Sequence, residues 1–206
     1  MRVERAPHGA RGVDTIIDFT ASRAKAIKAA GYDYVVRYLG RLTAFERDTI
    51  LEAGLALLAV NYSRRNGWKP SERTGDLDGL ASVGDAAKAG LPSGMTLWCD
   101  VEGPSGTAAD TIAHVNAWAS RVQASGYIAG MYVGYGIALT PEQMYHRLKV
   151  TAYWDSCSRN VTVAHRGFQM YQHYPGNVHV GELIVDINHI ETDAMGDTPA
   201  WLVGDP

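Results

Sequence analysis

The chain has 206 residues, enough for one large domain, and its hydrophobic content of 46% and charged content of 20% are ordinary for a globular protein. A formal net charge of −3, without any run of Lys and Arg, gives no support for nucleic-acid binding. No uninterrupted apolar stretch is long enough to span a bilayer, so we expect no membrane insertion, and the first residues show no apolar core of a signal peptide.

Strand-like and helix-like segments alternate over the first three quarters of the chain. Five short apolar segments, bounded by glycine or polar residues, read as strands: 12–19, 34–39, 55–62, 95–103 and 127–134. Each precedes a helix-like segment, and these cover 22–32, 43–54, 76–92, 107–126 and 140–149. Three more strand-like segments follow with little helix between them: 150–155, 168–174 and 183–190.

Eight strands of this kind predict an α/β fold. Continuous apolar strands separated by helices are typical of a parallel sheet that is buried on both faces. Eight of them favour a closed barrel over an open sheet. We therefore predict a single TIM-like barrel domain over residues 1–206, with eight mainly parallel strands, about five β/α units and three helix-poor strands. Its core spans about residues 12–190, and short N- and C-terminal extensions are expected on the surface.

Two acids close the fourth predicted strand, in the sequence LWCDVEG. Because side chains alternate across a strand, Asp100 and Glu102 share one face with Trp98, while Cys99 faces the other way. Two like charges on one face destabilise the fold unless one is protonated or a ligand uses both. A helix N-cap is the structural alternative for Glu102 alone. We expect Cys99 to be buried against the helices and not paired with Cys157.

Other acids lie in or at the end of predicted strands. Asp14 and Asp18 fall on one face of the first strand, Asp155 ends the sixth, and Asp186 lies in the eighth. In barrels of this class the chemistry takes place at the carboxyl ends of the strands. The sequence therefore predicts an acid-lined pocket at that end of the barrel.

Three kinds of chemistry fit an acidic barrel mouth. The histidines show no metal-ligand spacing, so no metal or cofactor is expected, although Mg²⁺ held by carboxylates alone stays open. Phosphate-sugar chemistry needs a glycine-rich anion site near the last strands, and HYPGNVHVG forms no such cradle. Glycoside cleavage needs an acid of raised pKa and a second group. Asp100, as a like charge, is expected to raise the pKa of Glu102.

Three motifs together resemble the glycoside hydrolase family 25 lysozymes. They are GVD in the first strand, DVE at the end of the fourth, and MYQHYPGNVHVGELIVDIN over the last two. The chain is most similar to a less characterised, glycoside-hydrolase-like branch of that family. The resemblance covers about residues 12–190 and implies a barrel of five β/α units and three further strands. It also implies hydrolysis of β-1,4 links in peptidoglycan or a related amino-sugar polymer, without a cofactor.

The resemblance also assigns site residues. By it, Glu102 is the general acid, Asp100 its partner at the reacting centre, and Asp14 and Asp186 the flanking acids. It further suggests sugar contacts from Tyr132, Tyr171 and Gln172. Asp18 is a further substrate-binding candidate, because TIIDFTA replaces the usual lysozyme residues after the first motif. Tyr171 replaces a Trp of the lysozymes and His173 a Tyr, which favours different sugar subsites.

The resemblance further implies the partner and the place of action. We expect a monomer that binds peptidoglycan or a related amino-sugar glycan, with no nucleic-acid partner. It would be made in the cytoplasm and would reach the cell wall after release or by specialised export, as a phage lysin does. The alternative, from a different class, is a barrel that binds the glycan but has lost turnover.

Overall fold

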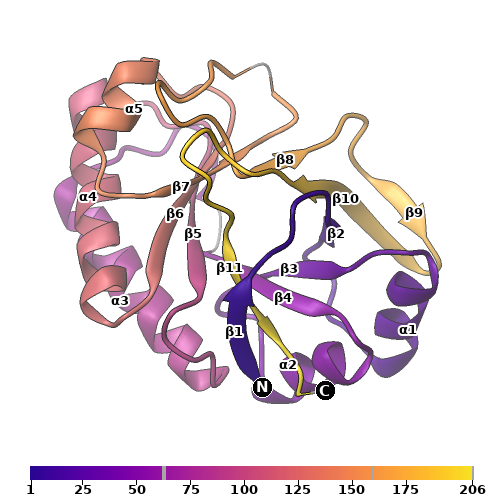
Figure 1. Cartoon of the computed structure of the whole chain (residues 1–206). Helices are drawn as coiled ribbons and strands as arrows, with labels where there is room; N and C mark the ends of the chain where they lie inside the picture. The colour runs from indigo at the N-terminus through magenta and orange to yellow at the C-terminus, as the bar shows by residue number, and fades with distance from the viewer. Residues whose placement is uncertain (62–63, 159, 206) are drawn as a thin grey trace.

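The computed structural model describes residues 1–61, 64–158 and 160–205, and within them eight strands close into a barrel (Figure 1). The predicted TIM-like barrel is therefore confirmed, while residue 62, the predicted end of the third strand, lies outside the described residues. The barrel strands, in order around it, are β2 (Arg11–Asp14), β3 (Tyr34–Tyr38), β4 (Ala56–Val60), β5 (Thr96–Val101), β6 (Ile128–Val133), β7 (Ala152–Asp155), β8 (Met170–Gln172) and β10 (Leu183–Ile190). Pairing of β4 with β5 closes the ring.

The described residues form five helices, one after each of the strands β2 to β6. They are α1 (Ala21–Ala29), α2 (Ala44–Glu52), α3 (Glu72–Lys88), α4 (Ala108–Ala124) and α5 (Pro141–Arg147). Each begins after a Ser or Thr whose hydroxyl accepts a hydrogen bond from a backbone N–H of the first turn, which satisfies a donor that the helix leaves free. None is long and apolar enough to cross a membrane.

One barrel strand runs against the others. Neighbours from β2 through β8 pair in parallel, whereas β10 is antiparallel to both β2 and β8. The carboxyl end of β10 therefore lies at the opposite end of the barrel from the carboxyl ends of the other seven. Asp186 reaches the same level as Asp14 because the antiparallel register sets these two residues directly opposite each other.

The expected extensions outside residues 12–190 each include a strand of the sheet; the N-terminal strand is mostly exposed, whereas the C-terminal strand is largely buried. The strands β1 (Arg2–Arg5) and β11 (Ala200–Val203) pair with each other, and β11 also pairs with β4 (Figure 1). Trp201 and Leu202 are buried, and the Trp201 ring lies 5.6 Å from that of Tyr34 inside the barrel. The reason is the apolar sequence AWLV, which buries its side chains by joining the sheet. The short strand β9 (Val178–Val180) forms a hairpin with β10.

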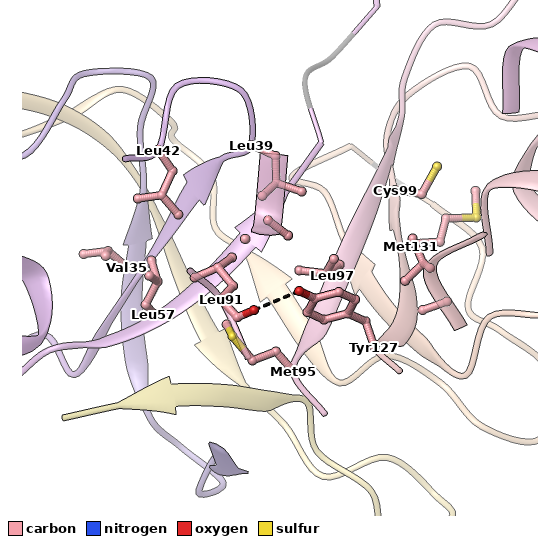
Figure 2. Packing of buried hydrophobic residues seen from close by; sticks show 14 of the residues in the cluster. Val35, Leu39, Leu42, Leu57, Leu91, Met95, Leu97, Cys99, Tyr127 and Met131 are labelled. Atoms are coloured by element: carbon pink, nitrogen blue, oxygen red, sulfur yellow. Dashed lines mark hydrogen bonds between the residues drawn. The ribbon is translucent and has the colours of Figure 1, made fainter. Parts of the chain in front are cut away.

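The strands have two apolar faces, as the alternation of their side chains requires. The inner face fills the barrel with large rings, among them Trp98 and Trp154, whose centroids lie 5.9 Å apart. The outer face packs against the helices. Figure 2 shows part of this outer packing, where Cys99 and Met131 come from neighbouring strands. The prediction for Cys99 is confirmed, since it is fully buried on the face opposite the acids and is a free thiol, as is Cys157.

Candidate active site

A cavity of about 300 Å³ opens at the carboxyl ends of the parallel strands. Every barrel strand, or the residues directly after it, contributes to its lining. The lining residues are Asp14, Tyr38, Val60, Asp100, Glu102, Tyr132, Trp154, Cys157, Ser158, Gln172 and Asp186. A larger hollow of about 540 Å³ lies at the other end of the barrel, around Trp201 and the chain ends, and it does not gather the acids of the strand ends. The acid-lined cavity is therefore the candidate active site.

The local structure explains why four carboxyl groups meet here. Asp14 is the last residue of β2, and Asp100 is the last but one of β5. Glu102 follows β5 directly and keeps the inward direction of Asp100, two residues earlier. Asp186 completes the set from β10 through its register with Asp14. The structure thus brings together the four acids that the resemblance assigned to catalysis.

Two amide side chains hold the Asp14–Asp186 pair. Gln172 Nε2 donates to Oδ2 of Asp14 at 3.1 Å and to Oδ2 of Asp186 at 3.3 Å. Asn188 Nδ2 donates to the same Asp14 oxygen at 2.8 Å. The Trp154 indole N–H, in turn, donates to Oδ1 of Asn188 at 3.0 Å, which orients that amide. Because Asp14 and Asp186 accept hydrogen bonds from the same Gln172 amide, their carboxyl groups are held close together. When both are ionised, their negative charges repel each other.

Asp14 has a strongly perturbed carboxyl group. It is 5% exposed, and its pKa is raised from 3.8 to about 7. Burial is the largest cause, and the negative charge of Asp186 adds to it, while the hydrogen bonds from Asn188 and Gln172 and the charge of Arg37 act in the opposite direction. A substantial fraction of the Asp14 side chains therefore keeps its proton near neutral pH. A shifted acid in a cleft is typical of functional sites.

Glu102 is half-buried, and its pKa is raised above the ordinary value of 4.5. Burial is the first cause and the negative charge of Asp186 the second. The expectation that Asp100 supplies the like charge is wrong, because the charge that raises the pKa of Glu102 comes from Asp186 on the other side of the barrel mouth. The peptide of Glu102 is held by the Trp68 indole, whose N–H donates to its carbonyl oxygen at 2.8 Å. This hydrogen bond holds the backbone of Glu102, and its carboxyl group keeps its proton to a higher pH than that of a free glutamate.

Aromatic side chains form one wall of the cavity. The Tyr132 hydroxyl donates to Oε1 of Gln172 at 3.0 Å, and its ring packs edge-on against Trp154 at 4.5 Å between centroids. Tyr38 lies at the end of β3, and burial among the acids raises the pKa of its hydroxyl well above the ordinary value. The pKa of the Tyr132 hydroxyl is raised in the same way, so both tyrosines stay neutral. Aromatic rings with a polar hydroxyl suit the apolar face and the hydroxyl groups of a sugar.

Two predicted substrate contacts lie elsewhere. Tyr171 is next to Gln172 in β8 and so points out of the barrel, where its ring stacks on His189 at 5.2 Å. Asp18 is not on a strand, because β2 ends at Asp14. Its carboxylate instead forms ion pairs with Arg37 at 3.2 Å and with Arg41 at 3.5 Å. The structure places neither side chain on the lining of the cavity.

The site also contains residues that the sequence motifs did not indicate, among them Asn188, Tyr38 and Cys157. Asn188 shares the inner face with Asp186, two residues earlier, so strand alternation could have identified it. Tyr38 ends β3 two residues after the buried Val36, which is the same signal. Cys157 lies in an irregular connection after β7, and no pattern in the sequence indicates that it reaches the cavity.

A second cavity, of about 360 Å³, continues the first. The two share Asp14, Tyr38 and Asp186, and the second is lined further by apolar residues that include Ile16 and Ile184. Both isoleucines are exposed. The two cavities therefore adjoin at Asp14, Tyr38 and Asp186, and the second adds an apolar surface beside the acids.

No three of the described acids of the cavity have their oxygen atoms within 4.8 Å of one another. In the parts of the chain that the structure describes, one group of three side chains has its ligand atoms close enough to share an ion. It consists of Glu142, His146 and His165, none of which lines the cavity.

Comparisons with known proteins agree with the barrel fold. An uncharacterised protein from B. stearothermophilus has the same fold with a TM-score of 0.71 at 19% identity, over 89% of this chain and 96% of that one. The Tat-secreted protein Rv2525c of Mycobacterium tuberculosis, in complex with L-tartrate, aligns with a TM-score of 0.69 at 16% identity, over 88% and 95% of the two chains. The catalytic domain of endolysin ply40 from bacteriophage P40 of Listeria monocytogenes gives 0.62 at 13% identity, over 91% and 95%.

These three likenesses establish the fold. A search of curated proteins by sequence gave no match. Residues 25–194 match the family described as "Rv2525c-like, glycoside hydrolase-like domain", which is most of the barrel. This chain therefore belongs to the Rv2525c-like family of glycoside hydrolase-like domains.

Proposed function

We propose that this protein cleaves β-1,4 links of peptidoglycan or a related amino-sugar polymer, with Glu102 as the proton donor. The observation that supports this most is the position of Glu102, a half-buried acid of raised pKa on a cavity that holds three more carboxyl groups. Glycoside hydrolysis requires one carboxyl group that still carries its proton near neutral pH and others that stabilise positive charge.

Glu102 gives its proton to the glycosidic oxygen as the bond to the anomeric carbon breaks. Positive charge then develops on the sugar ring, in a transition state of oxocarbenium character. Water adds to the anomeric carbon, and its proton passes to a carboxylate of the cavity, which completes the hydrolysis. Asp100 lies on the same face two residues earlier and stabilises that charge or orients the 2-acetamido group of the sugar. Asp186 keeps the electrostatic potential of the cavity negative and raises the pKa of Glu102, and Asp14 adds negative charge when it ionises around pH 7.

The shape of the site and the relatives support a polymeric substrate. The two adjoining cavities offer a surface that is larger than either alone, with the acids on one and the side chains of Ile16 and Ile184 on the other. Sugar rings bind to such a surface through their apolar faces, while their hydroxyls reach the polar groups. An endolysin catalytic domain and a Tat-secreted protein share the fold. We therefore propose that this protein acts on the cell wall after release or export.

The test is hydrolysis of purified sacculi and of chitin oligosaccharides between pH 4 and pH 8, with release of reducing ends as the readout. Glu102→Gln keeps the shape of the side chain but removes the transferable proton, so we expect kcat/KM to fall by about 10²–10⁴. Glu52→Gln changes an exposed glutamate of α2 in the same way and serves as the control, with activity expected to stay at the wild-type level.

A glycan-binding barrel without turnover is the second candidate. The pKa of Asp14, raised to about 7, favours it, because a neutral carboxyl group donates hydrogen bonds to sugar hydroxyls without any chemistry. Wild-type protein that sediments with sacculi but releases no reducing ends would establish this alternative. Glu102→Gln with full activity would refute the catalytic role, and the absence of both binding and turnover would refute the substrate class.

A further inference from the structure

A cluster of three metal-ligand side chains lies on α5 and on the segment that precedes β8. Glu142 and His146 stand four residues apart on α5, so they share one face of the helix. Oε2 of Glu142 lies 3.1 Å from Nε2 of His146 and 3.7 Å from Nε2 of His165. All three ligand atoms fall within 4.8 Å of one another.

The backbone brings His165 to the helix. The Ala164 N–H donates to the carbonyl oxygen of Pro141 at 3.3 Å, which ties this segment to the start of α5. His165 itself adopts a left-handed backbone with φ of 58°, uncommon for a residue other than glycine. The Tyr145 ring packs against the imidazoles of His146 at 4.8 Å and of His165 at 5.1 Å. Both rings are therefore held where their Nε2 atoms face the same carboxylate.

We infer that Glu142, His146 and His165 form a binding site for a divalent transition-metal ion of the zinc type. Zinc takes His nitrogen and carboxylate oxygen at about 2.0–2.2 Å, so tetrahedral donors lie roughly 3.3 Å apart. The spacings of 3.1 and 3.7 Å approach that value with small side-chain rotations. Two imidazoles favour such an ion over Mg²⁺ or Ca²⁺, which prefer oxygen ligands.

Ion pairing between Glu142 and the two histidines contributes too little to stability to explain why the three side chains lie together. The three side chains are 58–62% exposed, and pairs at such exposure contribute little to stability. A bound ion would join two elements that are separate in the sequence, and its remaining coordination positions would face solvent. Cys157 and Ser158, which line the acidic cavity, belong to the same β7–β8 connection as His165. The ion would therefore hold the β7–β8 connection against α5. Its site is separate from the acidic cavity where catalysis is proposed.

The experiment is isothermal titration calorimetry of untagged protein with ZnCl₂, together with thermal unfolding in the presence of Zn²⁺ or of EDTA. We expect one ion per chain and, at a hundredfold excess over Kd, a rise in Tm of about 5–10 °C. His165→Ala and Glu142→Gln should weaken binding by at least about tenfold. His179→Ala removes an exposed histidine of β9 and should bind Zn²⁺ like the wild type.

The variants carry exposed substitutions, so their Tm in EDTA should stay near that of the wild type, which separates metal binding from loss of folding. The absence of a one-to-one Zn²⁺ titration would overturn the inference. Binding that survives His165→Ala but disappears in His173→Ala would also overturn it, because it would place the ion on the His173–His189 pair, whose nitrogens lie 2.7 Å apart. Equal stabilisation by Mg²⁺ would contradict the nitrogen ligands.

Discussion

Asp14→Asn should flatten the pH dependence of stability. The raised pKa of Asp14 means that the folded state binds this proton more tightly than the unfolded chain does. Stability is therefore lost as pH rises from the unfolded pKa, near 3.8, through the folded pKa, about 7. The Asn side chain cannot ionise, and its carbonyl oxygen can still accept the hydrogen bonds that Gln172 and Asn188 donate.

The size of the effect follows from the two pKa values. Over the full interval, the difference between 3.8 and about 7 corresponds to about 4 kcal/mol, an upper bound. Between pH 5 and pH 8 alone, linkage gives a loss of about 2.5 kcal/mol from this group. With an m-value of roughly 2–3 kcal/mol per M, the urea midpoint of the wild type should fall by about 1 M more than that of the variant.

The assay is urea unfolding of both proteins at pH 5 and pH 8, followed by circular dichroism. We expect Asp14→Asn to match the wild type at pH 5 and to exceed it at pH 8. Parallel pH dependences in the two proteins would refute the assignment, since the remaining ionisable groups are common to both. A variant that is less stable than the wild type at pH 8 would show that the ionised carboxylate is stabilising, contrary to the argument from burial.

Other predictions concern the acid, the barrel end and a helix contact. Asp186→Asn removes the negative charge that faces Glu102 and so lowers the pKa of Glu102. The alkaline limb of the pH–rate profile should then move to lower pH, and a limb that does not move would contradict the interaction between Asp186 and Glu102. Trp201→Ala empties a buried position and should lower the free energy of unfolding in urea by about 3–5 kcal/mol; a loss below ~1 kcal/mol would contradict its role in filling the end of the barrel. Gly75→Ala would press a methyl group into the backbone of α4 and should destabilise by about 1–3 kcal/mol. Gly84→Ala on the same helix meets no atom within 4 Å and should stabilise by about 0.4–1 kcal/mol, so equal effects of the two would contradict the packing.

The alternation of side chains along a strand predicts part of the site correctly and also explains which predicted residues lie outside it. It placed Asp100 and Glu102 on one face and Cys99 on the other, as the structure has them. The same rule, applied to β8, separates Tyr171 from Gln172, because neighbours in a strand face opposite ways. The resemblance to lysozymes suggests sugar contacts from Tyr171 and from Gln172. In the structure, Gln172 lines the cavity and Tyr171 does not.

The sequence by itself determined the local features: apolar periodicity specifies the strands and the amphipathic helices, and their order specifies a barrel with acids at its strand ends. Only the tertiary structure decided which groups interact across the barrel. Asp186 meets Asp14 because β10 runs antiparallel, and strand direction has no signature within one strand. The pKa shifts of Asp14 and Glu102 arise from burial and from a charge on another strand, and both are properties of the assembled barrel mouth. For the same reason, the His165–Glu142 contact and the pairing of β11 with β4 exist only once distant segments have folded together.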